Sequence, residues 1–173
     1  MTLLFAQLAE TLPEGMSLFR GAIPLDRQLA VLDAIERVME QAPPFRPVMP
    51  TGAAMINSLT NCGTWGWFSD RRGYRYEEAH PETGKAWPAI PDVVLEFALE
   101  AAARAGYAFA PDACLVNIYG AEGKLGAHRD IDAQHDIIVF IFLLKDISHP
   151  HDLAHNGIFL LRNAHRDDFS LPA

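Results

Sequence analysis

Cysteine, basic residues and long apolar runs are all scarce in this sequence. Cys62 and Cys114 are the only two cysteines among 173 residues. They are too few for a disulfide framework, and neither belongs to a CxxC pair of the kind that binds zinc, so we expect two free thiols. Lys and Arg number 14 against 22 Asp and Glu, which gives a net charge of -8. This balance argues against a protein that binds nucleic acid mainly by covering phosphates, so any such role needs a local basic patch.

No apolar stretch approaches the roughly 20 residues that span a bilayer. The opening MTLLFAQLAE has no basic region before its apolar run and no small-residue cleavage pattern after it. We therefore expect a cytoplasmic protein with no membrane partner. Apolar residues make up 50% and charged residues 21% of the chain, which is typical of one globular domain.

Two amphipathic helices are predicted in the first two thirds of the chain. Asp26 can cap the first, QLAVLDAIERVMEQA, and Pro43 and Pro44 stop it. Its apolar stripe is formed by Leu29, Leu32, Ile35 and Met39. Pro91 opens the second, PDVVLEFALEAAARAG, and Gly106 closes it. The apolar face of this helix is formed by Val94, Phe97, Ala98 and Ala101.

The apolar period changes to two from Asp112 onward, which indicates strands. In CLVNIYG the alternation places Asn117 and Tyr119 on one face together with Leu115. Residues 137–144, IIVFIFLL, are apolar throughout and suit a strand buried on both faces. Helices first and strands after predict an α+β domain.

The stretch GAHRDID raises the possibility of a metal site. If KLGAHRDID is a strand, its period of two puts His128, Asp130 and Asp132 on one face. Two histidines and one carboxylate, with open positions beside them, are the ligands of non-haem Fe(II) oxygenases. The HxD pattern alone is a weak indication, because a solvated turn or a salt-bridged histidine gives the same letters more often.

A second unusual stretch is TNCGTWGWFSDRRGYRY, residues 60–76, where aromatic and arginine side chains alternate. Aromatic rings stack on unpaired bases and arginines contact phosphate, so the stretch fits a surface for a flipped or single-stranded nucleotide. The alternative is a β-hairpin with aromatic cross-strand pairs that serve only the core.

Together these segments resemble the AlkB-type Fe(II)- and 2-oxoglutarate-dependent dioxygenases, which reverse alkyl damage on nucleobases. The matching segments occur in family order over residues 44–132, and they are TNCGTWGW, RRGYRY, GKAWPAIP, ARAGY, PDACLVNIY and AEGKLGAHRDID. The resemblance implies a double-stranded β-helix, or jelly roll, with N-terminal helices and a nucleotide-recognition lid. We expect one domain over residues 1–173, with the helical and lid part in 1–110 and the start of the jelly roll in 111–173.

The resemblance also implies roles for individual residues. His128 and Asp130 match two iron ligands, and Asn117 and Tyr119 match contacts to 2-oxoglutarate. The residues that match the nucleotide-binding positions are Trp67, Tyr74, Arg75, Tyr76 and Asp132. The implied reaction couples oxidative decarboxylation of 2-oxoglutarate, which gives succinate and carbon dioxide, to hydroxylation of an N-alkyl group that then leaves as an aldehyde. The implied partner is alkylated DNA or RNA, single-stranded, and the protein is expected to be a monomer.

The sequence departs from the family pattern after Asp132. Residues 137–144 and NGIFLLRN could stand for two of the following strands, but no segment matches the HGDVVVW type that bears the second histidine ligand. The candidates for that ligand are His135, His149, His151, His155 and His165. Three hypotheses follow: an active nucleic-acid dealkylase, a truncated or decayed member that acts as a binding module, and a related oxygenase that acts on protein or a small molecule. The missing match predicts a jelly roll that is incomplete at its C-terminal end and a poor catalyst.

Overall fold

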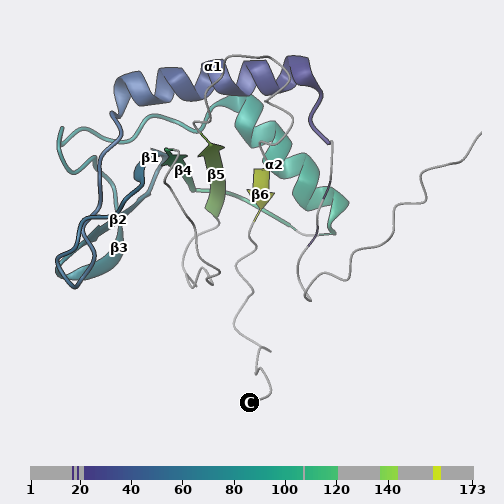
Figure 1. Cartoon of the computed structure of the whole chain (residues 1–173). Helices are drawn as coiled ribbons and strands as arrows, with labels where there is room; N and C mark the ends of the chain where they lie inside the picture. The colour runs from purple at the N-terminus through teal and green to yellow at the C-terminus, as the bar shows by residue number, and fades with distance from the viewer. Residues whose placement is uncertain are drawn as a thin grey trace, which may run out of the picture.

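Two helices cover one face of a four-stranded sheet, and a separate β-hairpin lies on the side away from the helices, next to β1 and β4 (Figure 1). The computed structural model describes residues 17, 19, 22–106, 108–120, 137–143 and 158–160. Along the chain the elements are α1 (Leu25–Gln41), β1 (Ser58–Gly63), β2 (Gly66–Asp70), β3 (Gly73–Glu77), α2 (Asp92–Arg104), β4 (Ala113–Tyr119), β5 (Ile137–Leu143) and β6 (Ile158–Leu160). No helix in the described ranges is long and apolar enough to cross a membrane.

The helix α1 ends before Pro43 and Pro44, as predicted, but its start differs from the prediction. Pro24 stands at the N-cap with extended backbone angles, so Asp26 lies inside the first turn and makes no capping hydrogen bond. There its negative charge still interacts favourably with the positive end of the helix dipole.

The buried stripe of α1 is rotated relative to the predicted one. It is formed by Val31, Ala34, Ile35 and Val38. Leu32 and Met39 are only partly buried at its border, and Leu29 is 50% exposed. The prediction followed the largest apolar side chains, whereas the helix turns its β-branched and small residues to the sheet, where the backbones can approach closely.

The helix α2 matches its prediction more closely. Pro91 is the N-cap, and Gly106 follows the last turn with a φ of 80°, the left-handed conformation that glycine adopts without strain. Val94, Phe97 and Ala98 are buried as expected, but Ala102 rather than Ala101 completes the buried set. The strands β1 to β3 precede α2 in the chain, so the expected order of helices first and strands after is not observed.

The main sheet has the strand order β1-β4-β5-β6. The strand β4 pairs antiparallel with β1 and parallel with β5, and β6 pairs antiparallel with β5. The strand predicted at 137–144 is thus β5, with a neighbour on each side. Because β1 comes from the expected helical and lid part and β4 to β6 from the expected jelly-roll part, both parts contribute strands to one sheet.

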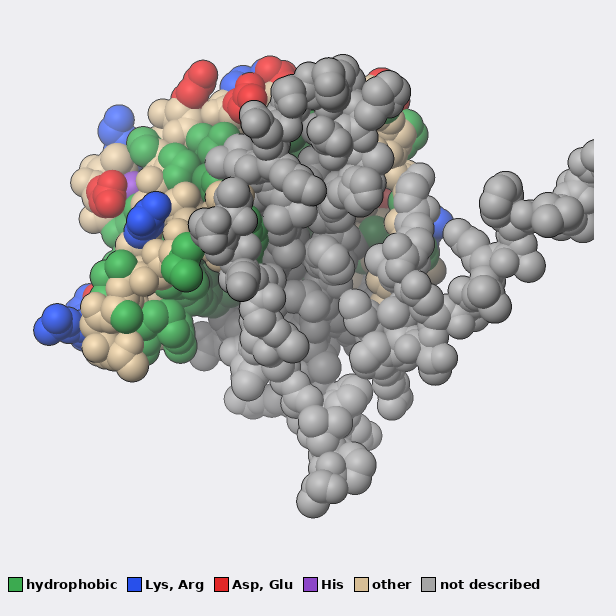
Figure 2. Space-filling model, in the orientation of Figure 1, with side chains coloured by type: hydrophobic (Ala, Val, Ile, Leu, Met, Phe, Trp, Pro, Cys, Tyr) green, Lys and Arg blue, Asp and Glu red, His purple; other side chains and the backbone are tan. Residues whose placement is uncertain are grey.

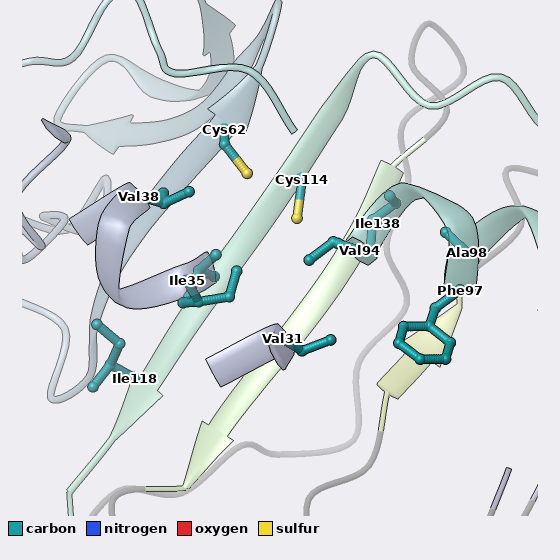
Figure 3. Packing of buried hydrophobic residues seen from close by; sticks show 11 residues of the cluster. Val31, Ile35, Val38, Cys62, Val94, Phe97, Ala98, Cys114, Ile118 and Ile138 are labelled. Atoms are coloured by element: carbon teal, nitrogen blue, oxygen red, sulfur yellow. The ribbon is translucent and has the colours of Figure 1, made fainter. Parts of the chain in front are cut away.

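The two faces of β4 have different neighbours, in agreement with the predicted alternation. Cys114, Val116 and Ile118 point toward the helices and lie in the main core. Figure 3 shows this packing, in which side chains from α1 and α2 meet those of β1, β4 and β5. Leu115 belongs to a second cluster on the opposite face, with partly buried Trp67 and Phe68 of the hairpin. The second face is therefore the one that the hairpin approaches.

Candidate active site

The segment TNCG forms most of β1, and each of its residues has a distinct structural role. The Thr60 hydroxyl donates a 2.7 Å hydrogen bond to the carbonyl of Ala42, just past the end of α1. Asn61 turns to the other face of the sheet and bonds to the backbone of the hairpin. Cys62 is buried beneath the helices. Gly63 closes the strand with a φ of 113°.

Gly63 is required by a close backbone contact. A Cβ at this position would lie 2.5 Å from the carbonyl oxygen of Asp112. The same oxygen accepts hydrogen bonds from the backbone N–H groups of Thr64 and Trp65, at 2.7 and 3.1 Å. These contacts tie the beginning of the hairpin to the beginning of β4.

The hairpin β2–β3 gathers aromatic side chains on one of its faces. Trp67 pairs directly with Tyr76 across the two strands, and Ser69 pairs with Tyr74. The rings of Trp67 and Tyr74 are stacked, with centroids 5.6 Å apart and an interplanar angle of 26°. Tyr74 is 56% exposed, whereas Tyr76 packs with Trp65 against Ala113 of β4. Both interpretations of this stretch therefore apply: it is an aromatic hairpin, and part of its aromatic surface faces solvent.

Arg75 lies on the opposite face of the hairpin and is already engaged. Its guanidinium donates two parallel hydrogen bonds of 2.9 Å to the carboxylate of Asp70, and it also bonds to Glu77. It stacks over the Phe68 ring at 4.7 Å. Hydrogen bonding with Arg75 holds the pKa of Asp70 well below its ordinary value, and the two carboxylates raise the pKa of Arg75. Contact between Arg75 and a phosphate would compete with these bonds, and its role in substrate binding stays a prediction.

Two other arginines stand at the turn of the hairpin. Arg72 is held loosely by Asp70 at 3.3 Å and its side chain is 78% exposed. The exposed Arg71 lies against the backbone of Gly52, whose added Cβ would come within 3.3 Å of the guanidinium. Figure 2 shows basic side chains next to hydrophobic ones over the hairpin end of the molecule, whereas several acidic side chains lie over α1. Arg71 and Arg72 are therefore the exposed cations at the turn, whereas Arg75 is neutralised by Asp70 and Glu77.

A buried tryptophan supports the base of the hairpin. The indole N–H of Trp87 donates a 2.8 Å hydrogen bond to the carbonyl of Glu77. Glu77 pairs with Gly66 in the hairpin register, and a Cβ on Gly66 would come within 2.3 Å of the Trp87 ring. Only glycine therefore fits at the first position of β2.

Other supporting residues were not singled out in the sequence. His80 is buried, accepts the backbone N–H groups of Glu82 and Thr83 at Nδ1, and lies 2.7 Å from the carbonyl of Pro43 through Nε2. Since Nδ1 accepts both bonds, Nε2 carries the proton and donates. Neither His80 nor Trp87 belongs to a periodic pattern, and only the segment GKAWPAIP drew attention to the second.

Asn117 and Tyr119 lie near the end of β4, on the face that the hairpin approaches. Asn117 is half-buried, and Leu59 of β1 stands directly opposite it. Tyr119 is buried. Because side chains two apart share a face, both continue the row that begins with Ala113 and Leu115 under the hairpin. The structure thus places the predicted co-substrate contacts and the aromatic hairpin on the same side of the sheet.

The predicted iron ligands His128 and Asp130, and the predicted base contact Asp132, lie outside the described residues. Within the described part of the chain, no group of three or more His, Cys, Asp or Glu side chains could hold a metal ion. The HxD segment at 128–130 offers an imidazole and a carboxylate, which are ligand types that suit Fe(II), and the roles of His128 and Asp130 stay a prediction.

Comparison with known proteins identifies the family. The model of the 2OG-Fe(II) oxygenase superfamily matches residues 15–147. The alpha-ketoglutarate-dependent dioxygenase AlkB of Salmonella typhimurium is 42% identical over 130 residues, which cover 72% of this chain and 60% of that protein. The chain belongs to the AlkB-type 2OG-Fe(II) oxygenases.

Two further relatives support the same family. AlkB of Escherichia coli is 43% identical over 99 residues, or 57% of this chain and 46% of that protein. The AlkB homolog of Caulobacter vibrioides is 35% identical over 122 residues, or 70% of this chain and 54% of that protein. The chain thus matches between 46% and 60% of the length of these relatives. The cofactors of this family are Fe(II) and 2-oxoglutarate, and the family fold is the jelly roll. In the described part of this chain, four strands form the main sheet and β2 and β3 form the separate hairpin.

Proposed function

We propose that this protein is an Fe(II)- and 2-oxoglutarate-dependent dioxygenase that removes N-alkyl groups from nucleobases in single-stranded DNA or RNA. The observation that carries the proposal is the aromatic face of the β2–β3 hairpin, which lies on the same side of the sheet as Asn117 and Tyr119. The AlkB names of the relatives support the reaction class.

In this proposal the hairpin is a lid that recognises the nucleotide. The stacked pair of Trp67 and Tyr74 offers a ring surface, and stacking on a base contributes about 1 to 3 kcal/mol. Arg71 and Arg72 stand at the turn beside this surface and would contact phosphate. Arg75 would mainly keep the hairpin rigid through Asp70 and Glu77.

The remaining roles follow the family pattern. His128 and Asp130 would hold Fe(II), Asn117 and Tyr119 would orient 2-oxoglutarate, and Asp132 would lie near the alkylated base. Bound Fe(II) would supply the activation of dioxygen. Asn117 is half-buried, and its place on β4 fixes the side of the sheet on which its side chain lies. We further propose that the protein works as a monomer in the cytoplasm.

Release of succinate from 2-oxoglutarate tests the proposal most directly. Because no segment matches the family's second histidine ligand, we expect the Fe(II)-dependent release to be slow. A single-stranded oligonucleotide with one methylated base should increase it, and the same oligonucleotide without the methyl group should increase it less. Trp67→Ala should reduce the stimulation and weaken oligonucleotide binding about 10- to 100-fold at fixed salt.

Two results would contradict this function in different ways. Tight binding of the oligonucleotide without any succinate release would indicate a binding module. Fe(II)-dependent release that no nucleic acid stimulates would indicate an oxygenase with a protein or small-molecule substrate.

A further inference from the structure

The side chain of Asn61 makes the hydrogen-bonded connection from β1 to the start of β2. Among the described strands, the main sheet contains β1, whereas β2 pairs with β3 in a separate sheet. Asn61 is 1% exposed, and its carboxamide bonds to the backbone of Trp67 twice. Its Nδ2 donates to the Trp67 carbonyl at 3.1 Å, and its Oδ1 accepts the Trp67 N–H at 3.0 Å. The side chain thus reproduces the paired N–H and C=O bonds that a neighbouring strand would make.

Both hydrogen bonds of Asn61 go to the backbone of Trp67, so they control the conformation of that residue. With the N–H and the C=O of Trp67 held, the backbone on each side of its Cα is fixed, and so is the direction in which the indole leaves the chain. The indole then lies against Tyr74, in the stacked geometry described above. Asn61 itself is buried, and leaving its amide unpaired there would cost free energy, so loss of these two hydrogen bonds is unfavourable.

Asn61 also connects the hairpin to the part of the sheet that carries the proposed co-substrate contacts. It stands opposite Leu115 in the β1–β4 register, and the next pair on that face is Leu59 with Asn117. The strand that anchors Trp67 through Asn61 is therefore paired directly with the strand that bears Asn117.

We propose that Asn61 is a positioning residue for nucleobase recognition. Its carboxamide holds Trp67 in the orientation needed for stacking before the nucleic acid binds, so that binding does not have to order the indole. This inference rests on the proposed function, because it assumes that Trp67 stacks on a base. Ordering one free side chain on binding weakens affinity by about 2- to 12-fold, which is the effect that the carboxamide would prevent.

A double-mutant cycle of Asn61 and Trp67 tests the proposal with the full chain. The measurement is the affinity for a labelled single-stranded DNA that carries one methylated base, at fixed salt. We expect Asn61→Ala to weaken binding about 2- to 12-fold in the wild-type background. In the Trp67→Ala background the same change should have no further effect, because there is no indole left to position.

Thr60→Val is the matched control. Thr60 is the neighbouring buried residue of β1, and its hydroxyl also donates to a backbone carbonyl, but on the helix side of the sheet. Thr60→Val should lower the melting temperature as a lost buried hydrogen bond does, and leave the affinity for the oligonucleotide unchanged. Asn61→Ala should change both. If both variants lose affinity, any destabilisation of β1 is enough to weaken oligonucleotide binding, and Asn61 has no specific positioning role.

Asn61→Asp provides a second variant if Asn61→Ala does not fold. The carboxylate still accepts the Trp67 N–H but offers no donor to the Trp67 carbonyl, so one of the two bonds is lost. The cycle is then run with this variant, and hydrogen exchange of the Trp67 amide is measured beside it. We expect faster exchange in Asn61→Ala than in Asn61→Asp, and slowest exchange in the wild type.

The outcomes separate this inference from the function it rests on. If Trp67→Ala binds the oligonucleotide as tightly as the wild type, stacking by Trp67 is wrong and both proposals fail. If Trp67→Ala binds weakly but the effect of the Asn61 substitution is the same with or without Trp67, only the positioning role of Asn61 is overturned.

Discussion

Cys62 and Cys114 stand directly opposite each other on β1 and β4, and both are 0% exposed. Figure 3 shows the two sulfur atoms in the core between the sheet and the helices. A hydrogen bond with Cys62, together with burial, raises the pKa of the Cys114 thiol well above its ordinary value. The pair fills the centre of the main core as two small apolar groups.

The first prediction concerns the reactivity of these thiols. Because the thiolate is the reactive form and neither sulfur reaches solvent, both should react with iodoacetamide only after the protein opens. Opening a small domain costs about 5 kcal/mol or more, so alkylation should be slower than in the unfolded chain by at least on the order of 10³-fold. Mass spectrometry with and without denaturant measures this ratio. Rapid alkylation of Cys114 in the folded protein would contradict the burial of the pair.

The second prediction concerns the base of the hairpin. Gly66→Ala places a methyl group within 2.3 Å of the Trp87 ring, so the ring or the strand must move. We expect a loss of about 1 to 3 kcal/mol of unfolding free energy, the usual effect of overpacking. Urea denaturation measures it. Gly120→Ala is the control, since no described residue lies within 4 Å of a Cβ there, and a loss of the same size in both variants would argue against the clash.

The third prediction concerns the stability of the protein at acidic pH. The pKa of Asp70 is lowered in the folded protein, so its ion pair with Arg75 contributes stability above the ordinary aspartate pKa of about 3.9. This contribution is lost as the pH falls below that value toward the folded-state pKa. Between pH 5 and pH 2, the melting temperature of the wild type should therefore fall more steeply than that of Asp70→Asn. Parallel curves would show that the ion pair has no net effect.

The fourth prediction concerns the metal. His128→Ala and Asp130→Ala should each abolish Co(II) binding and Fe(II)-dependent succinate release, because an open metal site has few protein ligands to lose. Visible absorption of bound Co(II) reports on the site without requiring turnover. Asp33→Ala is the control, since Asp33 forms an exposed ion pair with Arg37 on α1. Unchanged Co(II) affinity in both site variants would exclude them as ligands.

The sequence predicted the elements whose patterns are strong. Pro91 and Gly106 bracket α2, and the alternation in CLVNIYG gave both faces of β4. The buried stripe of α1 was misplaced because hydrophobic size does not say which side faces a sheet; the helix turned Val31 inward and left Leu29 outside.

The site was less predictable than the fold. Trp67, Tyr74 and Tyr76 could be recognised as an aromatic group, but the stacking of the Trp67 ring on the Tyr74 ring became visible only in the structure. The engagement of Arg75 depends on Asp70 and Glu77, which stand on the same face only once the hairpin register is known. The positioning role proposed for Asn61 could not be predicted from the sequence. Its hydrogen-bond partner is the backbone of Trp67, and the residue types in a sequence do not indicate contacts with backbone groups.

The pairing of β1 with β4 has a consequence for the folding kinetics of the protein. All of β2, β3 and α2 lies between these two strands in the chain, yet the strands are hydrogen-bonded neighbours. Such a pairing closes a long loop, and the entropy of that closure must be overcome before the contacts form. The helices and the hairpin are local and can form within microseconds, whereas the seam between β1 and β4 forms later. We expect closure of this pair to limit the folding rate, and the same closure brings the aromatic hairpin to the side of the sheet that carries Asn117.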